Sequence, residues 1–192
     1  MRARKFKIYR LILVGLLILV PATGIKYGWY HLFPKHFAEV ETGQLYRSGY
    51  CEPRPLENVL REHHIKTVLS LLNEEPNSKE EQNEQSVIHK TGTTLVHIGM
   101  PGNGCGTFDD LDHAAALMAD PNNRPILVHC SGGVNRTGAA YMAYRMRYCD
   151  WNFDQAFAEA VRYGHDPQAT PKMREHMMKY YQERVVSSRP AK

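Results

Sequence analysis

The sequence lacks the patterns that mark several large classes of protein. Its 24 Lys and Arg against 20 Asp and Glu leave a formal charge of only +4, and no basic stripe with interleaved aromatic residues follows the chain, which argues against nucleic acid as a partner. Ten histidines are scattered without the spacing of a metal site, so neither a metal nor a cofactor is expected. Cysteine is scarce, and the sequence leaves open whether Cys51, Cys105 and Cys149 are free or paired. What is present is a chain of 192 residues, 43% of them hydrophobic, which is enough for one core with an appendage.

The N-terminal segment, residues 1–36, has no charged residue between Arg10 and Lys26. Residues 11–20 are apolar, with basic residues before them and few after them. This pattern predicts a single hydrophobic helix in a membrane, with the N-terminus cytoplasmic and the following domain extracytoplasmic. The uncharged window is short for a membrane span. The alternative is therefore a signal peptide that is cleaved near residues 22–24, followed by export of the protein.

The most informative stretch runs from Ile126 to Gly138 and reads ILVHCSGGVNRTG. Its apolar, β-branched beginning predicts a buried strand, a glycine-containing loop follows, and a helix comes after the loop. Backbone N–H groups in such a loop, together with the helix dipole, make a site for an anion. Cys130 at the end of the strand would have its thiolate stabilised there, and the guanidinium of Arg136 matches two phosphate oxygens. The pattern indicates transfer of phosphate to sulfur.

The remaining pattern predicts one α/β domain over residues 37–192. Strands alternate with helices, which indicates a central, mostly parallel sheet flanked by helices on both faces. The loop after Cys130 would then lie at the carboxyl end of a central strand, where open α/β sheets bind ligands. The expected strands are 40–48 (as a hairpin or edge strand), 67–72, 94–98 and 126–130. The expected helices are 55–63, 77–90, 107–119, 138–148, 150–163 and 171–186, with Thr107 and Asp150 as caps.

The motif Cys-x5-Arg-Thr, preceded by Val-His and set between a strand and a helix, resembles the signature loop of the protein tyrosine and dual-specificity phosphatases. The usual loop of that family reads HCSAGVGRTG, and this chain departs from it at Gly132 and Asn135. Asn visits a positive φ more readily than other non-glycine residues, so these changes are compatible with the loop. The phrase LYRSG at residues 45–49 is similar to the opening of compact atypical dual-specificity phosphatases. The resemblance covers about residues 37–163 and implies hydrolysis of phosphomonoesters through a phosphocysteine.

The resemblance also implies a role for each residue of this loop. Cys130 would attack phosphorus as a thiolate, and Arg136 would bind two phosphate oxygens. Thr137 would donate its hydroxyl to the sulfur and help it leave, and His129 would orient the loop through backbone hydrogen bonds. The loop amides would bind the phosphate of the substrate. The expected binding residues are Ser131, Gly132, Gly133, Val134, Asn135 and Arg136.

The general acid is the least determined part of the predicted site. The family usually supplies an Asp from a loop before the signature strand, but the candidate loop, residues 99–108, contains no Asp. The candidates are Asp109 first, Asp110 second, and a mechanism without an Asp third. The opposing interpretation is that these acids are structural, because Thr107 and Asp110 have the spacing of a capping box. In addition, a helix N-terminus lowers the pKa of a nearby carboxyl group, whereas a general acid needs a raised pKa. The glycines of residues 99–108 favour a mobile flap.

The loop between Cys130 and Arg136 is neutral, whereas relatives that act on phosphoinositides or inositol polyphosphates place Lys or His there. This favours a phosphoprotein substrate, with phosphotyrosine first and phosphoserine or phosphothreonine second. One alternative is an inositol-phosphate or phosphoinositide phosphatase with the same mechanism. The other is a non-catalytic, membrane-anchored module that binds phosphopeptides, against which the reactive cysteine argues, since a pure binding module needs no thiol.

Overall fold

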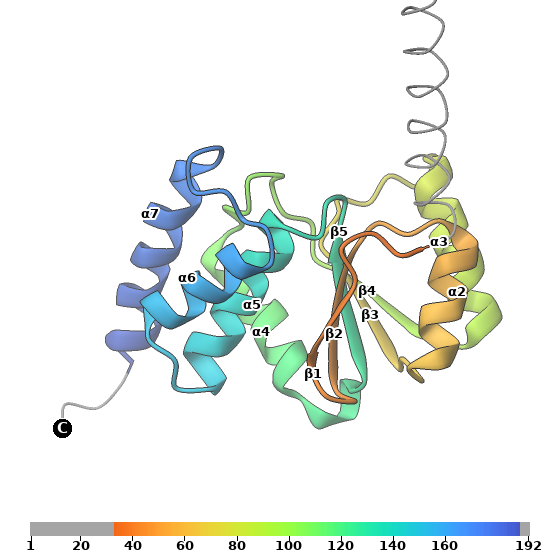
Figure 1. Ribbon diagram of the computed structural model, residues 1–192, viewed down its shortest axis with the longest axis horizontal. Coiled ribbons are helices and arrows are strands. Elements are labelled where there is room, and N and C mark those ends of the chain that lie inside the picture. The colour runs from red at the N-terminus through yellow and green to blue at the C-terminus, as the bar shows by residue number, and fades with distance from the viewer. Residues whose placement is uncertain (1–32, 189–192) are drawn as a thin grey trace, which may run out of the picture.

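The computed structural model describes residues 33–188, in which a five-stranded sheet lies between two layers of helices (Figure 1). The strand order is β1-β2-β5-β3-β4, with β1 antiparallel to β2 and all other neighbours parallel. The strands are β1 (Ala38–Glu41), β2 (Leu45–Gly49), β3 (Thr67–Ser70), β4 (Thr94–His97) and β5 (Ile126–Cys130). The helices are α2 (Pro53–Glu62), α3 (Lys79–Thr91), α4 (Phe108–Ala119), α5 (Asn135–Tyr148), α6 (Phe153–Arg162) and α7 (Pro171–Tyr180), with the short turns η1 (Pro121–Asn123) and η2 (Tyr181–Val186). The predicted α/β fold with a mostly parallel sheet flanked by helices is confirmed.

Strand β5 occupies the middle of the sheet and brings Cys130 to its carboxyl edge. It pairs with β2 on one side, where Gly49 lies opposite Cys130, and with β3 on the other, where Ser70 lies opposite His129. All of β5 is buried, as expected for a strand that is paired on both sides and covered on both faces. The carboxyl ends of three parallel strands therefore meet where ligands bind in open α/β sheets.

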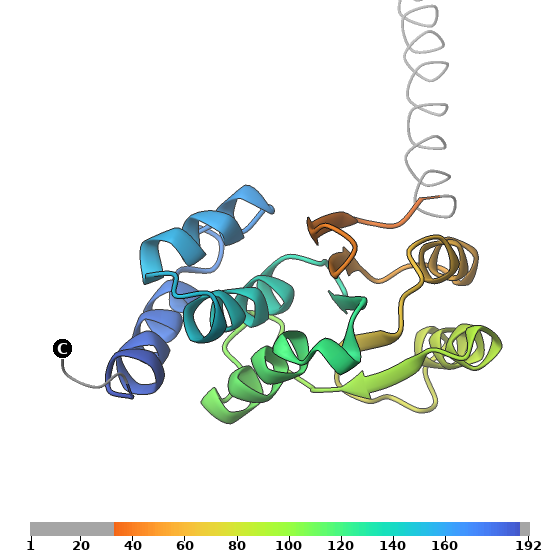
Figure 2. The same ribbon diagram turned by 90° about the horizontal axis from the view of Figure 1, so that it is seen from below.

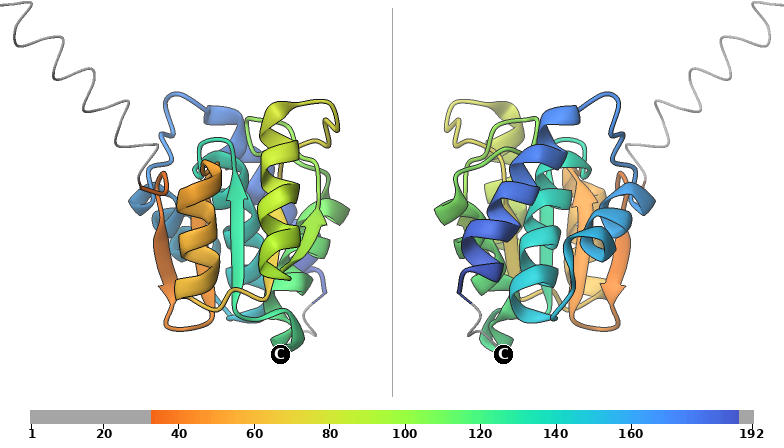
Figure 3. Two further views of the ribbon diagram at one scale, coloured as in Figure 1. Left: turned by 90° about the vertical axis from the view of Figure 1, so that its right-hand side faces the viewer. Right: turned by 90° about the vertical axis from the view of Figure 1, so that its left-hand side faces the viewer.

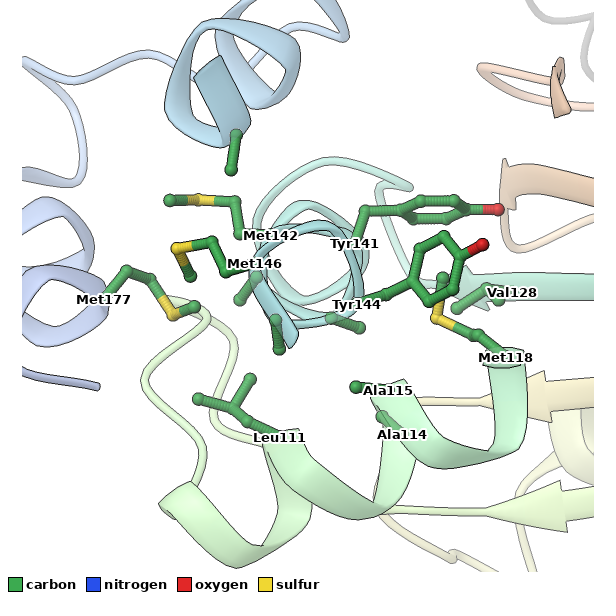
Figure 4. Close-up of a cluster of buried hydrophobic side chains, with 14 of the residues drawn as sticks. Leu111, Ala114, Ala115, Met118, Val128, Tyr141, Met142, Tyr144, Met146 and Met177 are labelled. Carbon is green, nitrogen blue, oxygen red and sulfur yellow. The ribbon is translucent and has the colours of Figure 1, made fainter. Parts of the chain in front are cut away.

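The two helical layers bury opposite faces of the sheet (Figure 2). Helices α2 and α3 cover one face, and α4 to α7 lie on the other (Figure 3). Because side chains alternate along a strand, Val128 and Cys130 join the core of the larger layer, whereas Leu127 joins that of the smaller one. Helix α5 lies within the larger layer, with Met142 on one side and Tyr141 directed at the sheet (Figure 4).

Three helix boundaries differ by three or more positions from those expected. Helix α5 begins at Asn135, three positions before the predicted start. Helix α6 is capped by Asn152 instead of Asp150, because the Asn152 side chain accepts a hydrogen bond from the Gln155 amide, while Asp150 takes a positive φ of 57° in the preceding turn. The last helix is α-helical only as far as Tyr180 and continues as the π-helical turn η2.

Most of the predicted membrane segment falls in residues 1–32, which lie outside the described residues, so its helix, orientation and cleavage stay predictions. Residues 33–188 contain no helix that is long and apolar enough to cross a membrane. The residues just before the predicted domain boundary contact the domain. The Lys35 carbonyl accepts a hydrogen bond from Gly49 N at 2.7 Å, and His36 Nδ1 lies 2.6 Å from Gly132 O.

Candidate active site

Cys130 ends β5, and it is only 3% exposed. The Gly133 N–H donates a hydrogen bond to Cys130 Sγ at 3.2 Å. Helix α5 begins directly after the loop, so the positive end of its dipole lies beside the loop. The predicted strand, loop and helix N-terminus are therefore present with the thiol at their junction, and this cysteine and the three others are free.

Gly133 gives the loop its shape. Its φ of +70° lies in the left-handed region, and a Cβ there would lie 2.5 Å from Gly49 N, so only glycine fits. Asn135 does not adopt a positive φ, although an asparagine could. It is the first residue of α5, and its Oδ1 lies 3.1 Å from His165 Nδ1. Gly132 has open space where a Cβ would lie. Both departures from the family loop are thus compatible with this geometry.

The surroundings of Cys130 lower the pKa of its thiol below its ordinary value. Burial alone would raise that pKa, but the hydroxyl and amide of Thr137, the Gly133 amide and the positive charge of Arg136 together favour the thiolate more strongly. Thr137 is fully buried, and its hydroxyl makes no hydrogen bond that would occupy it within residues 33–188. The hydroxyl is therefore available to the sulfur, whose thiolate form it favours.

Arg136 lines a cavity of about 290 Å³ next to the loop. Its Nη1 donates to Leu71 O at 3.4 Å and to Met100 O at 3.5 Å, so carbonyls that follow β3 and β4 hold the guanidinium in place. Ser131 lines the same cavity. Among the described residues, Arg136 is the only Lys or Arg on the cavity wall, and a guanidinium held in this way can present its other N–H groups to a phosphate.

His129 makes a different contact from the one expected. Because side chains alternate along β5, its ring points to the α3 side of the sheet, where Nε2 lies 2.7 Å from Glu84 Oε1 and both side chains are almost fully buried. Burial would raise the pKa of Glu84, but the contact with His129 holds it below its ordinary value, so the carboxylate is charged. The ring is therefore anchored to α3, and not to backbone groups of the loop.

The structure does not bring Asp109 or Asp110 to the cavity. Asp109 Oδ1 accepts a hydrogen bond from Arg184 Nη2 at 2.7 Å, and its side chain is 84% exposed. Asp110 belongs to a capping box, in which its amide donates to Thr107 Oγ1 and its Oδ2 accepts from Thr107 N, both at 3.1 Å. The capping box is confirmed, and this geometry does not support Asp109 as the general acid.

Asp109→Asn is accordingly expected to slow esters with good and with poor leaving groups to the same small extent, because the carboxylate is held in an exposed ion pair away from the cavity. Measuring kcat with p-nitrophenyl phosphate and with phenyl phosphate across pH checks this. Arg184→Gln breaks the same pair and is the matched control. If Asp109→Asn alone slowed phenyl phosphate by about 10²–10⁴-fold and lost the basic limb of the profile, Asp109 would be the acid after all.

Three of the four carboxylates on the cavity wall come from residues 77–90, which the sequence predicted only as a helix, and the fourth precedes that segment. They are Glu75, Glu80, Glu81 and Glu84. Glu81 and Glu84 are buried on the same face of α3 as Ile88, and this spacing of i, i+3 and i+7 is the signal that could have shown their burial. Glu81 also accepts a hydrogen bond from the Glu75 amide, which fixes the β3–α3 loop beside the cavity.

The geometry around Cys130 defines the class of the protein, since a stabilised thiolate beside an anion-binding loop is how cysteine-dependent phosphatases bind and attack phosphate. A family model described as the tyrosine phosphatase family matches residues 31–192. The chain belongs to this family, as the motif predicted.

Two curated relatives illustrate the range of the family. The chain is 29% identical to the inositol diphosphatase SIW14 of Saccharomyces cerevisiae over 134 residues, which cover 68% of this chain and 46% of SIW14. It is 33% identical to human tyrosine-protein phosphatase non-receptor type 23 over 85 residues, which cover 43% of this chain and 5% of that protein. The chain thus spans less than half the length of these relatives.

Solved structures extend the similarity to the fold. The crystal structure of the core catalytic domain of SIW14, a PP-IP phosphatase, in complex with citrate, has a TM-score of 0.66 and 25% identity, covering 81% of this chain and 91% of that one. A crystal structure of P. aeruginosa TpbA in complex with pTyr has a TM-score of 0.60 and 17% identity, covering 79% of this chain and 91% of that one. At that identity TpbA supports the fold alone.

Proposed function

We propose that this protein is a cysteine-dependent phosphomonoesterase that acts on phosphoproteins, phosphotyrosine first. The observation that carries the proposal is the thiol of Cys130, whose pKa is lowered in an anion-binding loop next to the cavity that holds Arg136. The thiolate is the nucleophilic form of cysteine, so this environment prepares the residue for attack on phosphorus. Binding of a phosphopeptide without catalysis would use the loop and Arg136 but would have no need of a stabilised thiolate.

In the proposed reaction the Cys130 thiolate attacks phosphorus, the bond from phosphorus to the ester oxygen breaks, and the departing oxygen takes up a proton. The loop amides and Arg136 bind the equatorial oxygens, over which charge is spread in the transition state. Water then attacks the phosphocysteine, loses a proton to solvent and forms inorganic phosphate. The sulfur leaves as a thiolate, which the Thr137 hydroxyl stabilises.

The charge of the cavity wall supports a protein substrate. The wall carries the glutamates named above, of which Glu75 and Glu80 are exposed to solvent. Glu81 accepts hydrogen bonds from the Glu75 amide and from the Gln85 side chain, which are neutral donors that leave its charge uncompensated. Carboxylates in this position repel an inositol ring that carries many phosphates and attract Lys or Arg next to a phosphorylated residue.

Hydrolysis of an inositol pyrophosphate is the second candidate. It is supported by the similarity of the chain to SIW14, an inositol diphosphatase, in both sequence and fold. This substrate carries additional phosphates, which would have to bind to groups other than Arg136. The glutamates on the cavity wall cannot bind them, because their negative charge repels phosphate.

We expect a phosphotyrosyl peptide flanked by Lys to have a kcat/KM about tenfold higher than the same peptide flanked by Asp, with a smaller difference at high salt. Replacing Glu75 and Glu80 together by Gln should remove most of that difference, because it removes the exposed charge of the wall. Glu183→Gln, at an exposed position of η2, is the matched control and should keep the difference. A higher kcat/KM on an inositol pyrophosphate than on either peptide would select the second candidate.

A further inference from the structure

Arg47 is a charged side chain buried within the sheet. It lies in β2, is 1% exposed and pairs in register with Val128 of β5. Its guanidinium faces aromatic rings of the larger helical layer, so it lies on the same face of the sheet as Cys130. Burying a charge is costly unless partners compensate it, which makes the partners of Arg47 informative.

The contacts of Arg47 direct it at the catalytic loop. Its Nη2 donates to Gly133 O at 2.8 Å. Its Cζ lies 4.2 Å from the centre of the Tyr163 ring and 5.4 Å from that of Tyr141, so two aromatic rings hold the guanidinium. Its Nη1 is buried and has no hydrogen-bond partner within residues 33–188. The side chain is thus fixed in place with one donor on the loop.

The positive charge of Arg47 has no carboxylate in contact with it among the described residues. Glu159 contributes to its electrostatic surroundings, but that carboxylate lies 3.0 Å from Arg145 and 3.6 Å from Arg162. Burial lowers the pKa of Arg47, whereas the nearby tyrosines, Glu159 and Cys130 act in the opposite direction. A guanidinium nevertheless stays protonated in proteins. The Cys130 thiolate is one of the negative charges that act on Arg47, and Gly133 connects the two residues through its carbonyl and its N–H group.

We propose that Arg47 is a positioning residue of the active site, which holds the Gly133 carbonyl from behind the loop and supplies a buried positive charge that stabilises the Cys130 thiolate. The inference rests on the proposed function only in taking Cys130 as the nucleophile, and it is independent of the substrate.

Gly133 links the two parts of this role. Its N–H donates to Cys130 Sγ at 3.2 Å, and its carbonyl accepts from Arg47 at 2.8 Å. Glycine is the most flexible residue of a chain, so a loop amide that must point at the sulfur needs an external restraint. The hydrogen bond from Arg47 is such a restraint, and its loss would leave a carbonyl without its buried partner.

The other groups around the sulfur belong to different elements. From α5, Arg136 and Thr137 act on the thiol. On β5 itself, the neighbouring His129 is turned to the opposite face and lies against Glu84 of α3. Arg47 is therefore the charged side chain that β2 places near the sulfur. A substitution of Arg47 leaves the groups on α5 and β5 in place.

The pH dependence of Cys130 alkylation by iodoacetamide measures the thiol pKa in the full chain without any substrate. In Arg47→Gln, which keeps a donor but removes the charge, the midpoint should rise by about one pH unit or more, so that alkylation below the midpoint slows about tenfold. In Arg47→Lys, which keeps the charge, the midpoint should stay close to that of the unchanged protein. Mass spectrometry locates the label, and Cys51 does not compete because burial raises its pKa to about 11.

Arg145→Gln is the control, since this core arginine of α5 is paired with Glu159 and Glu41, and its loss should leave the midpoint unchanged. Tyr163→Leu, at a half-buried position, removes one of the two rings that hold the Arg47 guanidinium. It should raise the alkylation midpoint by a smaller amount than Arg47→Gln does. This variant tests the role of Arg47 even if Arg47→Gln does not fold. An unchanged midpoint in either variant, or equal rises in Arg47→Gln and Arg47→Lys, would overturn the proposal. A chain with the expected midpoints but no turnover would instead refute the proposed function and leave the role of Arg47 intact.

Discussion

Cys130→Ser is expected to abolish turnover, with kcat reduced by a factor on the order of 10⁴–10⁶. The loop that stabilises a thiolate does not ionise a serine hydroxyl, so no comparable nucleophile is left. The loop amides and Arg136 are untouched by the change of a single atom. Inorganic phosphate should therefore bind about as tightly as before. Steady-state kinetics with p-nitrophenyl phosphate and calorimetric titration with phosphate measure the two effects separately.

Cys105→Ser is the matched control for this prediction. Cys105 is also a free cysteine, but burial raises the pKa of its thiol, so it is not prepared for attack and its replacement should keep full turnover. Substantial turnover in Cys130→Ser would show that another group attacks phosphorus. Loss of phosphate binding together with turnover would mean that the substitution disturbs the loop and not only the nucleophile.

Arg136→Lys is expected to lower kcat/KM by about 10²–10³-fold, comparable with the loss of a donor that stabilises transition-state charge. A guanidinium can hold carbonyls with one nitrogen and a phosphate with the others, and here Nη1 approaches the carbonyls of Leu71 and Met100. An ammonium group is a point charge on a flexible stem and cannot do both. The measurement is kcat/KM with p-nitrophenyl phosphate, whose good leaving group removes the question of the general acid.

The control for Arg136→Lys is Arg162→Lys, at a largely exposed position of α6 that carries the same change of head group. It should leave kcat/KM unchanged. Activity in Arg136→Lys close to that of the unchanged protein would show that positive charge alone suffices and that the bidentate geometry is not needed.

Local signals were sufficient to predict the centre of the site. A β-branched run followed by a glycine loop and a helix defined β5, the loop and α5, and the structure brings Cys130, Arg136 and Thr137 together as the motif implied. The capping box at Thr107 was equally readable, because both of its partners lie within one turn. Such features depend on residues close in sequence, which is why pattern alone reveals them.

The supporting residues were not predictable in this way. Arg47 contacts Gly133 across 86 positions, and His129 meets Glu84 only because β5 and α3 pack together. Glu81 and Glu84 lie in a segment that was predicted only as a helix, although their i, i+3 and i+7 relation to Ile88 places them on its buried side. Asp109 was attractive by its place in the chain, but the direction of α4 turns it toward Arg184. Charged residues take their role from tertiary neighbours, which local pattern does not specify.

The central claim is that phosphate passes through the sulfur of Cys130. Rapid acid quenching of the full chain during turnover of p-nitrophenyl phosphate, followed by mass spectrometry of its peptides, tests this most directly. The account predicts one phosphoryl group on the peptide that contains Cys130, formed and lost at rates that match turnover, and absent in Cys130→Ser. A phosphoryl group on any other residue during turnover, or turnover that persists in Cys130→Ser, would contradict it.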